Sequence, residues 1–312
     1  MILSASRRTD IPAFYTDWLM QRFAEGHVLV RNPINPHRVS NITLTPDVVD
    51  CIVFWSKNPR PLIPQLHRLH SYVYYFQFTL TAYGPDIEPQ VPSLSALIET
   101  FQRLSSLVGP ERIIWRYDPI FLNRCYSVDF HLASFERLAK DLQGAAHTCT
   151  ISFLDPYSSI RSFMRDFDVQ TISQGQMLQI AEHLQQIACA YGFQLNACAE
   201  ELDMRHIGVL PAHCIDASLI SRLCGIPIHA VKDTGQRAAC GCVQSIDIGA
   251  YHTCPHGCRY CYANHSRVLF QRNLAAYDVA SPLLCSTAHT DDIIRLRKVV
   301  SWKENQLSFF DD

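Results

Sequence analysis

Seven short runs of β-forming apolar residues recur along the chain, and most of the stretches between them are long enough for a helix and its loops. Short apolar runs that alternate with helix-length spacers are typical of βα units, whose strands pair in parallel. We therefore expect an α/β fold of the TIM type: a barrel-like parallel sheet of six to eight strands, complete or partial. The runs lie at 2–6, 51–55, 74–79, 112–117, 148–153, 194–198 and 245–250.

Between these runs the sequence predicts helices and one hairpin. Leu, Phe and Ile recur at three- and four-residue spacing in the predicted helices, at 13–25, 94–108, 129–143 and 173–191. Residues 28–45 indicate a hairpin, because two apolar runs flank the turn-forming segment 32–36. We expect a catalytic domain at 1–264 and a C-terminal extension at 265–312 packed on the barrel, with a surface amphipathic helix at 291–300.

The composition excludes several classes of protein. Hydrophobic residues make up 48% of the 312 residues and charged residues 18%, as in ordinary globular proteins and unlike disordered chains. The net charge of -2 gives no reason to expect nucleic acid or an anionic membrane as a partner. No apolar run reaches the roughly 18–20 residues of a membrane helix, and the first residues lack the order of a signal peptide. We expect a cytoplasmic protein.

Thirteen cysteines are many for such a chain, and eight of them lie between Cys198 and Cys261. In a reducing cytosol this crowding indicates metal binding or redox chemistry rather than a disulfide framework. We therefore expect the region 198–261 to bind metal. The other five are interpreted as small buried hydrophobic residues: Cys51, Cys125, Cys149, Cys189 and Cys285.

The densest cysteine motif is the segment Cys254–Cys261, CPHGCRYC, which places three thiols in the spacing C-x3-C-x2-C. Three thiolates satisfy three irons of a 4Fe-4S cluster and leave the fourth iron open to a small ligand. A structural zinc ion needs a fourth protein ligand, which His252, His256 or His265 would have to supply. The motif therefore favours an iron-sulfur cluster and leaves zinc as the alternative.

This spacing, with Tyr260 before the last cysteine, resembles the cluster loop of the radical S-adenosylmethionine (SAM) superfamily. The segment Cys254–Ala263 is similar to the loop of the spore photoproduct lyase branch. The chain as a whole resembles a bacterial family of unknown function, and the matching segments are Ser4–Asp10, Phe54–Pro59, Trp115–Pro119 and the cysteine loop.

The resemblance implies a chemistry but no substrate. It implies that Cys254, Cys258 and Cys261 hold a 4Fe-4S cluster whose open iron binds the amino and carboxylate groups of SAM, with Tyr260 against the adenine. A donor such as flavodoxin or ferredoxin would supply the electron that cleaves SAM to a 5'-deoxyadenosyl radical. That radical would abstract hydrogen from an unknown substrate.

One feature departs from the superfamily, in which the cluster loop follows the first strand of the barrel. Here it follows the last run, 245–250. A circular permutation reconciles the two if this run pairs beside residues 2–6, because domain termini commonly lie close together. The usual glycine-rich segment on the next strand is not recognisable, and the loop 6–10 takes its place.

A second set of cysteines precedes the last run and consists of Cys198, Cys214, Cys240 and Cys242. Four thiolates fully ligate a cluster, so we hypothesise an auxiliary 4Fe-4S cluster. The alternatives are a zinc site and unliganded cysteines, and Cys224 could replace one member.

Polar and charged residues gather after the predicted strands. The carboxyl ends of parallel strands share one face, where active sites of such folds are assembled. The candidate catalytic residues are Arg116, Asp118 and Lys57, and the candidates for cofactor contacts are Tyr260, Glu200 and Arg7. Arg7 and Arg8 are also candidates for binding an anionic substrate, and an ion pair with Asp10 or Glu201 that only fixes a loop is the equal alternative.

A radical SAM enzyme is the leading hypothesis, and two others come from different classes. A zinc-dependent barrel hydrolase or nuclease is suggested by fourteen histidines, but it would need histidine clusters at several strand ends. A non-enzymatic iron-sulfur electron carrier or sensor would not require charged groups on one rim of a barrel. It would also cleave no SAM.

Overall fold

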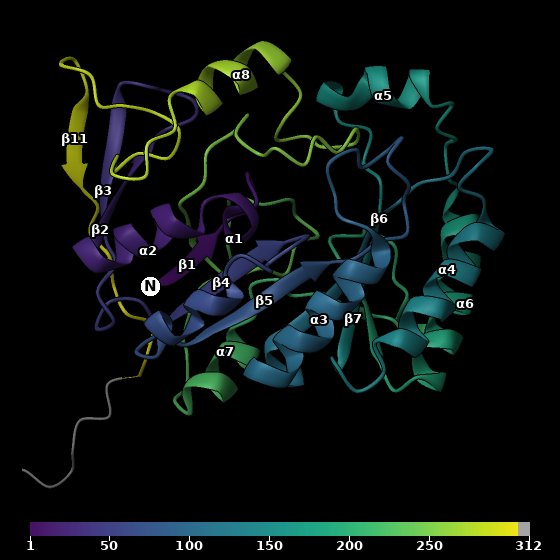
Figure 1. Cartoon of the computed structure of the whole chain (residues 1–312). Coiled ribbons are helices and arrows are strands. Elements are labelled where there is room, and N and C mark those ends of the chain that lie inside the picture. Colours follow the sequence, from purple (N-terminus) through teal and green to yellow (C-terminus); the bar gives the residue numbers. More distant parts are fainter. Residues whose placement is uncertain (305–312) are drawn as a thin grey trace, which may run out of the picture.

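The computed structural model describes residues 1–304, and its centre is an eight-stranded parallel sheet (Figure 1). The strand order is β10-β1-β4-β5-β6-β7-β8-β9, with β10 and β9 at the two edges, so the sheet is an open form of the expected barrel. The predicted α/β class is confirmed. The strands are β1 (Ile2–Ala5), β4 (Cys51–Ser56), β5 (Tyr74–Thr79), β6 (Ile113–Ile120), β7 (Thr148–Phe153), β8 (Gln194–Ala197), β9 (Leu210–Pro211) and β10 (Ile246–Asp247).

All seven predicted strands are present in this sheet. β1 is buried along its whole length and β4 nearly so. Parallel strands covered on both faces give continuous apolar runs rather than an alternating pattern, which is why the sequence identified them. The eighth strand, β9, has only two exposed residues and carries no such run.

The last strand pairs with the first, as the sequence analysis expected. Leu3 pairs with Ile246 and Ser4 with Asp247, in parallel. The Asp247 carboxylate accepts hydrogen bonds from the Ser4 and Ser6 hydroxyls at 3.0 and 2.6 Å and from the Arg7 backbone N–H at 2.8 Å. The chain that follows β10 therefore starts beside the loop that follows β1.

The predicted helices are present with one interruption. The range 13–25 is divided at Tyr15 into α1 (Ile11–Phe14) and α2 (Thr16–Glu25). Serine side chains cap three others at their first turns, a favourable N-cap arrangement. These are α3 (Leu94–Val108), α4 (Val128–Asp141) and α6 (Gln174–Ala190).

Three further helices were not predicted: α5 (Arg161–Asp166), α7 (Ala217–Cys224) and α8 (Arg267–Ala275). α5 and α8 lie beyond the carboxyl ends of the strands (Figure 1). Short 3-10 segments occur at Ile63–Leu69, Pro110–Arg112, Ser158–Ile160 and Arg205–Ile207.

Helices α4 and α6 pack on the sheet through large apolar side chains. Trp115 of β6 stacks on Phe135 of α4 with ring centroids 4.7 Å apart, and both residues are fully buried. Burial of each such side chain contributes on the order of 1.5–3 kcal/mol. This packing holds the strand that also carries Arg116 and Asp118.

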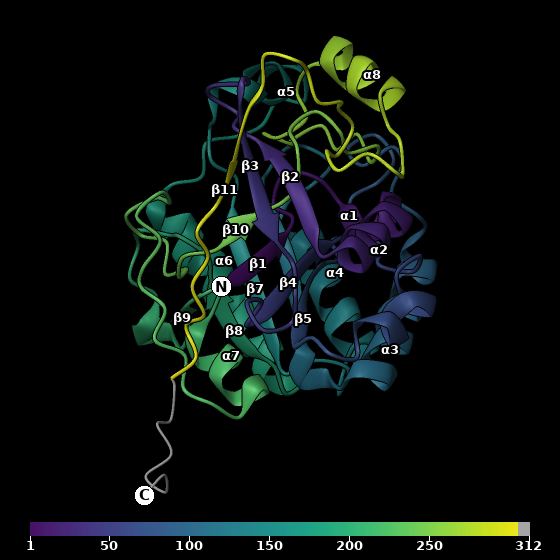
Figure 2. The ribbon, with the colours of Figure 1, turned by 90° about the vertical axis from the view of Figure 1, so that its left-hand side faces the viewer.

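A second, smaller sheet contains the predicted hairpin. β2 (His27–Arg31) pairs antiparallel with β3 (Arg38–Thr43), and β11 (Ile293–Leu296) adds to β3 in parallel (Figure 2). The amphipathic helix expected at 291–300 is therefore wrong. The open edge of β3 offers unpaired backbone groups, and the β-branched pair Ile293-Ile294 extends along it.

The division into a domain at 1–264 and an extension at 265–312 stays a prediction. Leu283 of the extension packs against Leu29 and Val39 of the hairpin. The last part of the extension, 305–312, lies outside the described residues. Among the helices of residues 1–304, none is both long and apolar enough to span a bilayer.

Replacing Gly249 by alanine should disturb the junction of β1 and β10. A Cβ at this position would lie 2.1 Å from the Ser6 hydroxyl oxygen. We expect a loss of about 1–3 kcal/mol in the free energy of unfolding, measured by urea denaturation. Gly175→Ala is the matched control, because no heavy atom lies within 4 Å of its added Cβ. Equal stability of the two variants would contradict the close approach.

His131 should make the stability of the protein fall in mild acid. Its ring contacts the Tyr117 hydroxyl and the Phe121 carbonyl at 2.9 Å, and burial lowers its pKa to about 4. Since the unfolded chain takes up this proton near its ordinary pKa of about 6.5, stability is lost as the pH falls from there toward 4. From about pH 7.5 to about pH 5, wild type should lose about 2 kcal/mol more than His131→Gln in urea denaturation. Parallel pH profiles would contradict this assignment.

Candidate functional site

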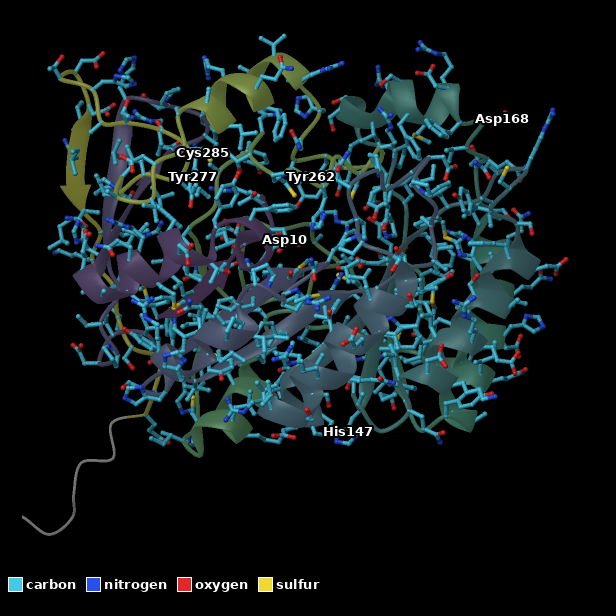
Figure 3. The ribbon with its side chains drawn as sticks, in the orientation of Figure 1. Asp10, His147, Asp168, Tyr262, Tyr277 and Cys285 are labelled. Carbon is cyan, nitrogen blue, oxygen red and sulfur yellow. The ribbon has the colours of Figure 1, made fainter. Side chains whose placement is uncertain are left out.

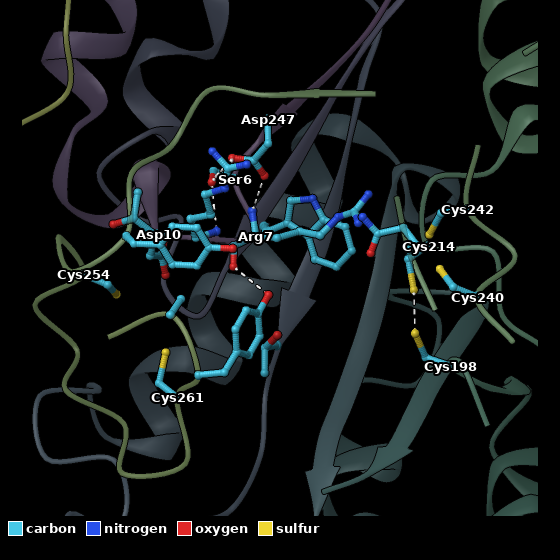
Figure 4. Close-up of a pocket in the computed structure, with 18 of the residues that line it drawn as sticks. Ser6, Arg7, Asp10, Cys198, Cys214, Cys240, Cys242, Asp247, Cys254 and Cys261 are labelled. Carbon is cyan, nitrogen blue, oxygen red and sulfur yellow. Dashed lines mark hydrogen bonds and ion pairs between the residues drawn. The ribbon is translucent and has the colours of Figure 1, made fainter. Parts of the chain in front are cut away.

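A cavity of about 820 Å³ opens at the carboxyl ends of the strands, and both cysteine sets line it. Figure 3 shows Asp10 and Tyr262 at this end of the molecule and His147, which precedes β7, at the opposite end. In Figure 4, Cys254 and Cys261 lie on one side of the cavity and the second set on the other. We call Cys254, Cys258 and Cys261 the triplet, and Cys198, Cys214, Cys240 and Cys242 the quartet.

The triplet lies on a loop that folds back on itself after β10. The backbone N–H of Cys261 donates to the Cys258 carbonyl at 3.1 Å, and the His252 N–H donates to the Ala263 carbonyl at 2.9 Å. Gly257 has a φ of 67°, in the left-handed region that glycine adopts without strain. The turn brings the three thiols to the cavity, and all three are free.

Backbone N–H groups point at two of the triplet sulfurs. Burial raises the pKa of Cys254 to about 12, and hydrogen bonds from the backbone of Asp10 and His256 oppose this rise. Burial also raises the pKa of Cys261, and the backbone of Ala263 and Asn264 opposes it. Such donors stabilise thiolates and are characteristic of the surroundings of metal-bound cysteine.

Asp10 ties the triplet loop to two other segments. One carboxylate oxygen accepts from the Ala13 N–H at 3.0 Å and caps α1, while the other accepts from the Lys57 N–H at 2.7 Å. His256, between the first two cysteines, contacts that second oxygen through Nε2 at 2.9 Å. Both side chains are buried. Because this ring nitrogen is engaged by Asp10, His256 is poorly placed to complete a zinc site.

Lys57 lies beside the triplet, paired with a carboxylate that the sequence analysis missed. Its ammonium contacts Glu88 at 2.8 Å, and Glu88 also accepts from the Thr81 hydroxyl at 3.0 Å and from the Tyr260 hydroxyl. Burial disfavours the charged ammonium, but Glu88 and Cys258 raise the pKa of Lys57 overall. Lys57 is therefore a neutralised cation, and Tyr260 is held in place by its hydroxyl.

The quartet sulfurs form a continuous series of contacts. The sulfurs of Cys198 and Cys214 are 3.2 Å apart. The side chains of Cys214 and Cys242, and those of Cys242 and Cys240, are close enough to shift each other's pKa. The Cys242 side chain lowers the pKa of Cys240 to about 7. Segments far apart in sequence thus bring together the four cysteines that were predicted as one set.

Arg116 and Asp118 belong to the quartet side of the cavity. One guanidinium nitrogen donates to the Cys214 sulfur at 2.9 Å and to Gln77 Oε1 at 3.1 Å. The other two donate to the carboxylate oxygens of Asp118 at 3.1 and 2.6 Å. Burial disfavours the charged guanidinium, yet Asp118 and Cys214 raise the pKa of Arg116 well above its usual value. A permanent cation next to a thiol favours the thiolate.

Glu200 and Arg7, the other two residues predicted to contact the cofactor, have different surroundings. Glu200 accepts a hydrogen bond from the Phe153 N–H at 2.9 Å and so joins the loop after β8 to the end of β7. Burial raises the pKa of Glu200. Arg7 lines the cavity, with its guanidinium over the Trp55 ring at 5.4 Å. The geometry therefore gives Glu200 a role in joining two strand ends, and leaves Arg7 available to a ligand.

The spacing of possible ligands does not favour zinc in the triplet. A tetrahedral zinc ion with bonds of about 2.3 Å holds its sulfurs about 3.8 Å apart. Within residues 1–304, the three-residue group whose ligand atoms all lie within 4.8 Å of one another is His37, Asp291 and Asp292. That group is near the surface, and Asp292 is paired with Arg31 at 2.5 Å. No three sulfurs of the triplet or of the quartet all lie within 4.8 Å of one another, although those of Cys198 and Cys214 are 3.2 Å apart.

Comparison with known proteins identifies a family but no activity. Residues 2–263 match the model of the family described as Domain of unknown function (DUF1848). No curated protein matches the chain. A solved structure of a Bacteroides thetaiotaomicron protein, provisionally assigned as an alpha-L-fucosidase, is 8% identical with a TM-score of 0.28. That alignment covers 73% of this chain and 84% of the other, and at this level of similarity it supports no functional conclusion.

Replacing Glu88 by glutamine should leave the buried Lys57 ammonium without its counter-charge. Removing one partner of a buried ion pair costs about 3 kcal/mol, so we expect a loss of this size in urea denaturation. Glu99→Gln, at an exposed position of α3, should change stability by less than about 0.5 kcal/mol. The double variant Glu88→Gln/Lys57→Met should recover much of the loss. A loss below about 1 kcal/mol in Glu88→Gln would contradict the role of this pair.

Proposed function

The chain belongs to the DUF1848 family, and from the geometry of its site we propose that it is a radical SAM enzyme that acts on an unknown substrate. The observation that carries the proposal is the triplet itself. Its three thiols, in the order C-x3-C-x2-C, line a large cavity at the carboxyl end of a parallel sheet. The pairing of β10 with β1 also gives the strand order that a circularly permuted barrel of this class requires.

The residues of the triplet loop fit a 4Fe-4S cluster with one open iron. The three thiols are free, they are spaced more widely than a zinc ion requires, and two of them receive backbone N–H groups. A fourth cysteine is not part of this loop. These features match a cluster that keeps one iron for a small ligand.

When bound and reduced, such a cluster supplies the electron that cleaves SAM and yields a 5'-deoxyadenosyl radical. Cys254, Cys258 and Cys261 would hold it. Lys57 lines this part of the site, and its pairing with Glu88 behind the wall leaves no net charge there. Glu88 also orients the Tyr260 ring by accepting from its hydroxyl. Tyr260 thereby presents a fixed aromatic surface to the cavity, suited to an adenine ring.

We further propose that the quartet holds an auxiliary 4Fe-4S cluster. Four thiolates complete the ligation of such a cluster, and Arg116 offsets part of their negative charge through its bond to Cys214. Asp118 keeps the guanidinium in this position with two hydrogen bonds. In this arrangement Arg116 and Asp118 are positioning residues for the quartet.

Anaerobic reconstitution followed by iron analysis tests both assignments. We expect about eight irons per chain in wild type and about four in either set of alanine variants. Only substitution of the triplet should abolish the change that SAM causes in the electron paramagnetic resonance spectrum, and the release of 5'-deoxyadenosine with a chemical reductant. Cys189→Ala is the control, because Cys189 lies outside both sets. It is exposed, as is Cys125, so the burial predicted for these two cysteines is wrong.

Two outcomes would contradict the radical SAM assignment of the triplet. Stoichiometric zinc with no response to SAM would favour the hydrolase, and bound iron without SAM cleavage would favour an electron carrier. Unchanged iron content in the quartet variant would remove the auxiliary cluster alone.

A further inference from the structure

The cavity between the two cysteine sets contains a cation that the other described residues do not neutralise. Within residues 1–304, no carboxylate lies within ion-pair distance of the Arg7 guanidinium. Its Nε atom is buried and has no hydrogen-bond partner there. Buried donors in native proteins are nearly always satisfied, so an orphan donor in a cavity indicates a missing acceptor.

Three other cations of the same cavity are neutralised. Lys57 is paired with Glu88 at 2.8 Å, Arg116 with Asp118 at 2.6 Å, and Arg237 with Asp155. A neutralised cation has little reason to attract a further anion. Arg7 is therefore a half-buried guanidinium of this cavity whose Nε donor is free within the described residues.

A second orphan donor lies next to Arg7. The Arg7 guanidinium carbon lies over the Trp55 ring, 5.4 Å from its centroid. The indole Nε1 of Trp55 is likewise buried and has no hydrogen-bond partner in residues 1–304. Arg116 lies over the same ring at 5.2 Å. The two residues come from neighbouring strands, since Arg7 follows β1 and Trp55 belongs to β4, which pairs with it. The stacking holds the guanidinium plane, so its donors are preorganised for an acceptor.

Building on the proposed radical SAM function, we propose that Arg7 and Trp55 form an oxyanion subsite that binds a carboxylate or phosphate group of the substrate. A guanidinium binds both groups with two parallel hydrogen bonds, and the indole N–H adds a third donor. The subsite lies between the two cysteine sets: the charge of Arg7 acts on Cys242 of the quartet and on Tyr262, which follows the triplet, and Trp55 packs among the quartet residues.

This position separates the subsite from the methionine end of SAM. The open iron at the triplet would bind the amino and carboxylate groups of SAM, on the other side of the cavity in Figure 4. The cavity of about 820 Å³ is large within the roughly 300–1,000 Å³ of small-molecule sites, so it has room for a small substrate besides SAM. The substrate is therefore a small organic anion whose charged group is held at Arg7.

Calorimetric titration of the reconstituted full-length protein with inorganic phosphate and with succinate tests the subsite. We expect one of these probes to bind wild type and to bind Arg7→Gln about tenfold more weakly or worse. The preferred probe distinguishes a phosphate from a carboxylate substrate. Arg60→Gln, which removes the same charge at an exposed position, should bind like wild type. Trp55→Phe retains an aromatic ring under the Arg7 guanidinium but removes the indole N–H. It should weaken binding of the probe about threefold.

The spectral response to SAM shows whether Arg7 binds an anionic group of the substrate or the carboxylate of SAM. Arg7→Gln should retain the change that SAM causes in the electron paramagnetic resonance spectrum. Loss of that change would assign Arg7 to the SAM carboxylate and overturn the substrate subsite. Wild type that binds neither probe, or variants that bind as wild type does, would also overturn it. If wild type itself gives no response to SAM, the radical function fails, while Arg7-dependent anion binding still supports the subsite.

Discussion

The carboxylate of Asp247 joins the last strand of the sheet to the first, and the position of the triplet depends on this junction. β10 has only two residues, so its backbone ladder with β1 is short. The hydrogen bonds from Ser4, Ser6 and the Arg7 backbone to Asp247 strengthen it. Gly249 lets the chain pass Ser6 at close range. Without this junction the triplet loop would not lie beside Asp10, and the contact between His256 and the Asp10 carboxylate could not form.

The cavity is organised by the neutralisation of buried charge. Each side has a cation that is paired with a carboxylate, Lys57 with Glu88 near the triplet and Arg116 with Asp118 near the quartet. Buried ions are costly without such partners, so these pairs allow charged groups to remain next to clusters of thiols. Arg7, between the two sides, has an aromatic ring in place of a carboxylate, which leaves its donors open to a ligand.

The strands, the hairpin and most of the long helices could be predicted because their patterns are local. A buried parallel strand is a continuous apolar run, and an amphipathic helix repeats every three or four residues. The prediction failed where a distant segment determined the outcome. Residues 293–296 form a strand because β3 has an open edge, and the helix expected at 13–25 is divided at Tyr15, whose hydroxyl donates to the Thr253 carbonyl.

The candidate site divides in the same way. The cysteine spacing within Cys254–Cys261 is a property of eight consecutive residues, so the sequence alone locates that loop and predicts a chemical class for it. The contacts that build the site around it are between residues far apart in the sequence. Asp10 and His256 are separated by 246 positions, and Arg116 and Cys214 by 98. Glu88 has no local pattern that marks it. A buried ionisable group takes its partner from whichever segment the packing brings near, and only the folded sheet brings these segments together.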